Sequence, residues 1–502
     1  MAEVGRPRPA RERRLVTVSL VLGMFLAALE ATAVATAMPT AIAELGGVSR
    51  YSWVFSAYLL TSTTTVPLYG KLADLYGRRR IYLIAVALFL LGSALSGAAG
   101  SLEQLIVFRA IQGLGAGGVM PVSITLIGDI YPLEQRGRVQ GLFSSVWGVS
   151  SLIGPALGGI ITDLFSWRWV FYFNLPFGLP SAVILALFFH ERPTRREHRL
   201  DLPGTLGLTT AVTLLLIALL EGSEVWGWTS PATLGLLGAA TAGLALFLWH
   251  ETRAIEPMLP LDLFRSRVIS VSSAGTLVVG TLLFSASAFV PMYAQGVLAG
   301  TAADAGATLA PMSIGWPIAS TLAGRLLLRV GYRRLVILGG FLTLAGAGLL
   351  AGPGHDATRA DLMIAMLVMG LGMGFTSTPY IVAVQNAVPW ARRGVATSSV
   401  QFFRTIGGAV AVASLGAVLN THLARALGSD INSNAMLDPE LRAGLPPHTV
   451  RILASALGDG LSTVFLAFVA VAAGGLVIAF LFPPGPATAH AYREAEPPLP
   501  ED

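Results

Sequence analysis

Fourteen long apolar stretches constrain the fold of this chain more than any other feature of its sequence. A helix needs about 20 apolar residues to cross the roughly 30 Å hydrocarbon layer of a bilayer. The stretches are too long, and alternate too little, for the strands of a membrane β-barrel. They cover residues 15–37, 52–73, 81–99, 104–126, 139–161, 169–189, 202–221, 232–250, 268–292, 306–328, 335–352, 361–385, 395–420 and 462–482. We therefore predict an all-α membrane protein with 14 transmembrane helices.

The composition excludes several other classes of protein. Of the 502 residues, 54% are hydrophobic and 12% are charged. Soluble domains contain about 25% charged residues, and disordered chains combine low hydrophobicity with high charge, so neither class fits. The absence of cysteine excludes disulfides, cysteine zinc sites and thiol catalysis.

The basic residues are distributed unevenly between the two predicted sides of the membrane. Twenty-five of the 33 lie in the N-terminal segment, the C-terminal tail and the loops after every second helix. Six lie on the other side, and Arg109 and Arg404 lie within helices. Because loops rich in Lys and Arg stay in the cytoplasm, both termini are predicted to be cytoplasmic in a multi-pass protein of the cell membrane. This orientation accounts for the net charge of +5, and we expect no nucleic-acid partner.

A weak internal repeat divides the chain into two halves. The segment 70–80 recurs at 324–334, and the segment 132–137 recurs at 389–394, with offsets of 254 and 257 residues. Two features at nearly one offset indicate a duplicated half. Parallel six-helix repeats with the cargo site at their interface are a transporter architecture.

This repeat predicts two six-helix bundles with two extra helices inserted between them. The predicted parts are a basic cytoplasmic segment (1–14), an N-terminal bundle (15–190), two linker helices (200–252), a C-terminal bundle (265–482) with a long outer loop at about 421–461, and a disordered cytoplasmic tail (483–502).

Several motifs resemble those of the major facilitator superfamily, and specifically of its fourteen-span drug:proton antiporters. The similarity extends over about residues 15–482. The matching motifs are Gly70 to Arg80, Arg109-x-x-Gln112-Gly113, Gly148 to Gly159, and Leu29-Glu30-x-Thr32. The resemblance implies a multidrug efflux transporter rather than an enzyme, driven by the proton gradient, with no cofactor and no metal.

Glu30 and Arg109 are predicted to be the proton-coupling residues. A carboxylate in the middle of the bilayer costs about 2.5–3.5 kcal/mol on insertion scales, so such residues usually have a function. At ~1.5 Å per residue, both side chains lie ~22 Å from the cytoplasmic face, so a contact between them is feasible. We hypothesise that Arg109 restrains the proton affinity of Glu30. The alternative is a structural ion pair that carries no protons.

The resemblance implies two further groups of functional residues. In a cytoplasmic gate, it places Asp74 at the start of the thirteenth helix near Gly394, and Arg78 against Asp129. The expected gate residues are Gly70, Asp74, Gly77, Arg78 and Asp129. The expected antiporter motif is Gly148, Gly154, Pro155, Gly158 and Gly159, for which ordinary close packing of helices is the alternative.

The cargo is predicted to be an amphipathic or lipophilic compound. The candidate cavity residues are Trp147, Gln295, Trp316, Tyr380, Gln385, Asn386, Gln401 and Arg404. The alternatives are export of lipids or lipid-like metabolites, passive facilitation, and a membrane-embedded lipid-modifying enzyme, although no metal or nucleophile motif supports an enzyme. We expect the lipid bilayer, small substrates and protons as partners, and a monomer.

Overall fold

The computed structural model of the chain describes residues 10–45, 51–191, 201–224, 226–254, 257–300, 302–352, 357–427 and 446–490. Throughout these residues the regular structure is helical. Most residues of each of the fourteen predicted stretches are helical, so the prediction of an all-α fold is confirmed.

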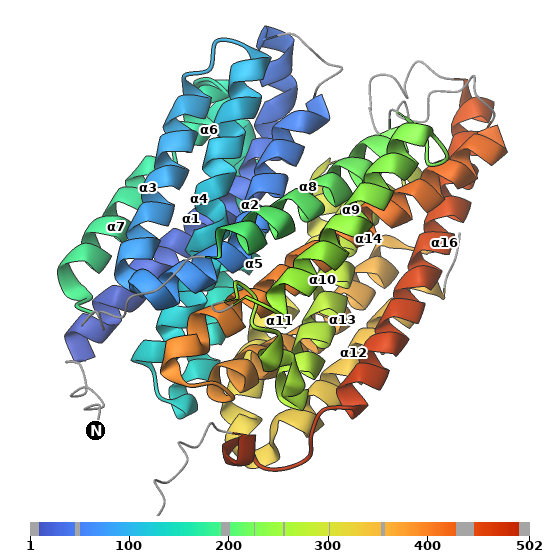
Figure 1. Cartoon of the computed structure of the whole chain (residues 1–502). Coiled ribbons are helices and arrows are strands. Elements are labelled where there is room, and N and C mark those ends of the chain that lie inside the picture. The colour runs from blue at the N-terminus through green and yellow to red at the C-terminus, as the bar shows by residue number, and fades with distance from the viewer. Residues whose placement is uncertain are drawn as a thin grey trace, which may run out of the picture.

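The helices form two bundles with a helical pair between them in the sequence (Figure 1). The N-terminal bundle comprises α1 (Ala10–Leu45), α2 (Tyr51–Tyr76), α3 (Arg78–Gly97), α4 (Leu102–Ile130), α5 (Leu133–Leu164), α6 (Arg168–Tyr172) and α7 (Leu175–Phe188). The pair is α8 (Leu202–Glu224) and α9 (Pro231–Glu251). The C-terminal bundle comprises α10 (Arg267–Met292), α11 (Ala302–Val330), α12 (Tyr332–Ala351), α13 (Arg359–Asn386), α14 (Arg393–Leu427) and α16 (Pro447–Phe480).

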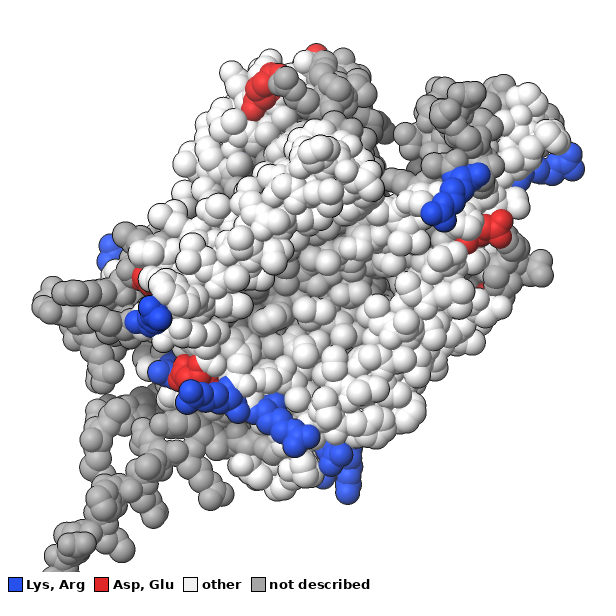
Figure 2. All heavy atoms as spheres, turned by 45° about the vertical axis from the view of Figure 1, so that its right-hand side comes forward, with Lys and Arg blue, Asp and Glu red and all other residues white. Residues whose placement is uncertain are grey.

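The outer surface of the protein suits a bilayer. Among the described residues, nine helical stretches are long and apolar enough to cross a membrane. On the face seen in Figure 2, charged side chains lie near the two ends and a broad uncharged band separates them. The protein is therefore a multi-pass membrane protein, while the number of 14 crossings remains a prediction.

Two predicted boundaries are wrong. The outer loop expected at 421–461 is shorter, because α14 continues to Leu427 and α16 begins at Pro447. The added turns of α16 bury Leu453 and Leu457, and apolar burial on one face stabilises a helix. The tail expected to be disordered from residue 483 is instead ordered to residue 490, with Ala487 packed in the core beside α11 and α13. Residues 1–9, 428–445 and 491–502 of the predicted terminal segments and loop lie outside the described residues.

The two halves repeat the same local backbone features at the predicted offset. Gly77 precedes α3 with φ 92°, and Gly331 precedes α12 with φ 83°. A side chain at either position would be strained, because L-residues rarely adopt positive φ. Pro132 caps α5, and Pro389 occupies the equivalent place before α14. These shared turns support the duplication that the sequence indicates.

The two bundles meet along two seams. In one seam α5 packs against α11, and in the other α2 packs against α14. Figure 1 shows the bundles close together at the end where the described chain begins and ends, and diverging toward the opposite end. We call the first end, which contains Gly77, Asp129, Gly324 and Arg393, the closed end.

The α5–α11 seam depends on residues without bulky side chains. The backbones at Gly137 and Gly324 touch so closely that a Cβ atom on either glycine would overlap the other. Further along, Gly141 lies against Thr321 and Gly148 lies against the carbonyl of Ser313. Small residues allow such close approach of helices in membranes. The sequence analysis did not identify this contact.

Gly137→Val should therefore force the closed ends of α5 and α11 apart. The native chain contains no cysteine, so a single cysteine introduced at Thr321 reports the seam without background. We expect a several-fold faster reaction of this cysteine with a polar maleimide in the Gly137→Val variant. Gly238→Val is the control, because a Cβ at Gly238 has nothing within 4 Å. Equal labelling rates in both variants would contradict the assigned seam.

Candidate transport site

A buried ion pair joins α1 and α4 inside the N-terminal bundle. Glu30 and Arg109 are each 2% exposed, and Arg109 Nη1 donates a hydrogen bond to Glu30 Oε1. The guanidinium also donates to Gln112 Oε1 at 2.7 Å and to the Val54 carbonyl at 3.3 Å. The structure thus brings together the two residues that the sequence analysis placed at equal depth.

Asn174 completes the environment of the carboxylate. Its Nδ2 donates to Glu30 Oε2 and to Ser93 Oγ, the latter at 2.8 Å. Asn174 lies at the break between α6 and α7, which divides the predicted stretch 169–189. Asn174 is not among the residues predicted from the sequence. The available signal is an uncharged polar residue inside an apolar stretch, two residues before Pro176.

Hydrogen-bond donors and an aromatic ring surround the two charged groups. Donors to both oxygens stabilise a carboxylate, and the Tyr58 ring centroid lies 4.3 Å from the Arg109 guanidinium carbon. A buried ion pair contributes little net stability, because desolvation of both charges offsets their attraction. The repeat position of Arg109 in the second half is Met366, a fully buried apolar residue. The pair therefore belongs to one half only and is not required by the fold.

Asp74 connects the two bundles at the closed end. Its Oδ1 accepts from the Gly394 amide at 2.9 Å, and its Oδ2 accepts from the Val395 amide at 2.7 Å. These amides are at the start of α14, where free N–H groups and the helix dipole attract an anion. A Cβ on Gly70 would overlap Ser398 of the same helix, so Gly70 permits this approach.

Arg78 is fully buried beneath this contact. Its Nε lies 2.7 Å from Asp129 Oδ2, and its Nη2 donates to Asp74 Oδ1 at 2.9 Å and to the Trp390 carbonyl at 2.7 Å. The guanidinium carbon is 3.9 Å from the Trp390 ring centroid. The contacts implied for Asp74 and Arg78 are therefore present, together with Trp390, which the sequence analysis did not name.

The closed end contains two equivalent contacts between the halves. In one an arginine binds a carboxylate, and in the other an arginine binds a neutral amide. Arg393 Nη1 binds Asp129 Oδ1 at 2.7 Å, and Arg136 Nη1 donates to Asn386 Oδ1 at 3.2 Å. Arg136 and Arg393 are repeat counterparts, as are Asp129 and Asn386, each separated by 257 residues. Each arginine reaches from one half to the other. The offset found in the sequence was the signal that would have identified these residues.

Four of the eight predicted cargo residues do not lie with the other four. Gln385 donates from Nε2 to the Ile124 carbonyl at 2.9 Å, so Gln385 and Asn386 belong to the closed end. Tyr380 is buried in the core of the C-terminal bundle, where its ring centroid lies 6.2 Å from the ring centroid of Phe482. Gln295 lies in a π-helical turn, Tyr293–Val297, that follows α10.

The other four predicted cargo residues come from helices of both seams. The Arg404 guanidinium carbon on α14 is 5.6 Å from the Trp316 ring centroid on α11. One turn away, Gln401 Nε2 lies 3.0 Å from Met120 Sδ in the other bundle. The buried atoms Trp147 Nε1 and Gln401 Oε1 have no hydrogen-bond partner, and no carboxylate pairs with Arg404 among the described residues. Trp147 and Gln401 therefore offer unsatisfied polar groups, and the Arg404 guanidinium lies near them on α14.

The predicted antiporter motif falls in α5. Gly148 provides the close contact with α11 described above, whereas a Cβ at Gly159 has nothing within 4 Å. Gly154 and Gly158 are buried, and the side chain of Pro155 lies outside the described residues. Close helix packing is thus assigned to Gly148 and not to Gly159.

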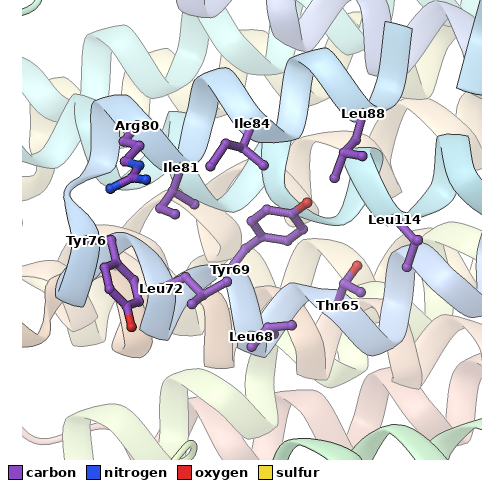
Figure 3. A pocket seen from close by; sticks show the side chains of 10 residues that line it. All are labelled: Thr65, Leu68, Tyr69, Leu72, Tyr76, Arg80, Ile81, Ile84, Leu88 and Leu114. Carbon is purple, nitrogen blue, oxygen red and sulfur yellow. The ribbon is translucent and has the colours of Figure 1, made fainter. Parts of the chain in front are cut away.

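A groove of about 450 Å³ lies between α2, α3 and α4 (Figure 3). It contains none of the predicted cargo residues. Its lining is mainly apolar, with Arg80 and Tyr76 at one end. Exposed side chains such as Ile84 and Leu114 suit contact with lipid acyl chains.

Comparison with known proteins identifies the family. The family model described as Major Facilitator Superfamily matches residues 20–412. The chain belongs to the major facilitator superfamily. It is therefore a membrane transporter of small molecules and not an enzyme.

Relatives within this superfamily include named multidrug transporters. The chain is 35% identical to "Multidrug transporter protein MdtP" of Bacillus subtilis over 94% of this chain and 93% of that protein. It is 32% identical to "Multidrug resistance protein Stp" of Mycobacterium tuberculosis over 89% of this chain and 82% of that protein. The crystal structure of the human organic anion transporter MFSD10 shares the fold, with TM-score 0.63, 14% identity, and coverage of 93% of this chain and 100% of that chain.

Arg78→Lys should destabilise the closed end, because a lysine cannot make the forked contacts of the guanidinium. We expect a loss of about 2 kcal/mol in the free energy of unfolding, since buried polar groups of Asp74 and Asp129 lose donors. Reversible denaturation in detergent measures this change. Arg80→Lys on the exposed rim of the groove is the control and should change stability by less than about 0.5 kcal/mol. A similar small change in both variants would contradict this role of Arg78.

Proposed function

We propose that this transporter exports amphipathic or lipophilic compounds across the cell membrane in exchange for protons. The observation that carries the proposal is the buried pair of Glu30 and Arg109, which is present in one half of the repeat only. A structural ion pair without a function is disfavoured in an apolar bundle, because both charges must be desolvated. The named multidrug relatives support drug efflux as the direction of transport.

The contacts of Glu30 suggest how protons are exchanged. In this proposal Glu30 is a carboxylate while Arg109 and Asn174 donate to its oxygens, and it accepts a proton when Arg109 moves away. Protonation removes the charge and weakens the contact with Arg109, and without that contact the apolar surroundings favour the protonated form. Return of Arg109, or arrival of cargo, then displaces the proton. Each charge that crosses 100 mV gains ~2.3 kcal/mol, which is the expected source of energy.

The closed end is proposed to face the cytoplasm, in agreement with the excess of basic loops. In this assignment Asp74, Arg78 and Arg393 keep the cytoplasmic side shut while the opposite side is open. Inward opening requires α2 to leave α14 and α5 to leave α11. Because the contacts are hydrogen bonds and ion pairs across narrow seams, they break as a group.

Glu30→Gln tests the coupling directly, because the amide is nearly isosteric but does not titrate. With fluorescent lipophilic compounds in inverted vesicles, we expect the wild type to accumulate dye when a pH gradient is imposed. The variant should still exchange dye but lose gradient-driven accumulation. Glu44→Gln is a matched control, since Glu44 pairs with Arg168 at an exposed position.

Two outcomes would count against the proposal. Undiminished accumulation by Glu30→Gln would remove Glu30 as the proton carrier. A wild type that moves no dye at any gradient would favour lipids or lipid-like metabolites as cargo.

Arg404, Trp316 and Trp147 suggest what the cargo presents to the protein. An aromatic body can stack on Trp316, and a hydrogen-bond acceptor or an anionic group can accept from Arg404 and Trp147. We therefore place compounds with an aromatic body and an acceptor group among the preferred cargo.

Arg404→Gln should reduce transport of a carboxylated aromatic dye more than transport of its methyl ester. Loss of a charge-assisted hydrogen bond of about 1.5–3 kcal/mol corresponds to a rise of roughly tenfold or more in KM for the acid. Initial transport rates for both dyes measure the effect, with Arg168→Gln as the control. An equal rise in KM for acid and ester would exclude this contact.

A further inference from the structure

Two carboxyl groups face each other where the inserted helices α8 and α9 come together. Asp201 directly precedes α8, and Glu251 is the last residue of α9. The Asp201 side chain is 6% exposed, and Glu251 is 4% exposed. One oxygen of each is satisfied: Asp201 Oδ1 accepts from the Gly204 amide at 2.9 Å and lies 2.8 Å from His250 Nε2, while Glu251 Oε2 accepts from the Leu259 amide at 3.0 Å.

The second oxygen of each carboxyl group has no donor. Asp201 Oδ2 and Glu251 Oε1 are both buried and unpartnered. A Cβ atom on Gly204 would overlap both oxygens. This atom would lie 2.6 Å from Glu251 Oε1 and closer still to Asp201 Oδ2. The two oxygens therefore converge on one point that the missing side chain of Gly204 leaves free. Ionised carboxylates only accept hydrogen bonds, so these two oxygens can bond to each other only if one of them carries a proton.

Among the described residues, one titratable side chain contacts the pair. His250 is the charged or titratable neighbour, and it contacts Asp201 from α9. Arg253 beyond α9 stacks on Trp249, with its guanidinium carbon 4.2 Å from the ring centroid. In the apolar cluster that α8 and α9 share with α2 and α14, Val66 of α2 and Phe402 of α14 are buried.

We propose that Asp201 and Glu251 bind one proton between them, and that this proton fastens the α8–α9 hairpin to the segment that leads into α10. Glu251 Oε2 accepts a hydrogen bond from the Leu259 amide of that segment. Met258 and Leu259 pack in one apolar cluster with Val66 of α2 and Phe402 of α14. This cluster connects the proton site to α2 and α14, the two helices of the α2–α14 seam.

The proton resides on Glu251. Although burial raises the pKa of Asp201, the hydrogen bonds from Gly204 and His250 outweigh it and hold that pKa below its usual value. The His250 side chain is 34% exposed, so it gives the pair a route to solvent. This site is separate from Glu30, and its existence does not depend on proton-coupled transport.

Loss of the proton places two negative charges side by side, so the hairpin should loosen as pH rises. We expect the Tm of the purified wild type to fall between mildly acidic and mildly alkaline pH. Glu251→Gln supplies an amide donor to Asp201 at every pH, so its Tm should change much less with pH. Asp262→Asn is the control, because Asp262 pairs with Arg392 at a half-exposed position, and it should follow the wild type. A Glu251→Gln variant with the pH profile of the wild type would overturn the proposal.

Infrared spectroscopy tests the same proton without relying on the stability of one variant. The wild type should show a carboxylic C=O stretching band that disappears as pH rises and is missing from Asp201→Asn and Glu251→Gln. Gly204→Ala should also lose this band, because its Cβ separates the two oxygens. A band that all three variants retain would exclude a shared proton. Gradient-driven accumulation by Glu251→Gln should persist, which distinguishes this site from Glu30.

Discussion

The ion pair between Glu30 and Arg109 is the interaction on which the functional account of this protein depends. A charge inside an apolar bundle persists only with a partner and with donors for its remaining lone pairs. Asn174 supplies the remaining donor, and the break between α6 and α7 positions it. Both Glu30 oxygens accept hydrogen bonds, and movement of Arg109 would leave one of them without its donor.

The two halves share a backbone but differ in charge. Gly77 and Gly331 make the same turn, yet Met366 replaces Arg109 at the equivalent position in the second half. At the closed end, Asp129 corresponds to the neutral Asn386. Among the described residues, the buried carboxylate–guanidinium pair lies in the first half.

The sequence predicted what depends on composition, local pattern and motif. Apolar length located the helices, and the motif at 70–80 located the contacts of Asp74 and Arg78. It did not predict contacts that depend on the register of distant helices, such as Gly137 against Gly324. For the same reason Gln385 was assigned to the cargo site, since its side chain reaches across to α4 at a place that hydropathy does not reveal. The proposed proton site at Asp201 and Glu251 depends on where two helix ends lie relative to each other, which a linear sequence does not reveal.

Proton release on cargo binding tests the central claim most directly. Purified protein in weakly buffered detergent at mildly acidic pH is mixed with a lipophilic dye while a pH indicator is recorded. The account predicts that binding to the wild type releases protons and that the Glu30→Gln variant binds dye without releasing them. Dye binding with no release by the wild type, or with equal release by the variant, would contradict it.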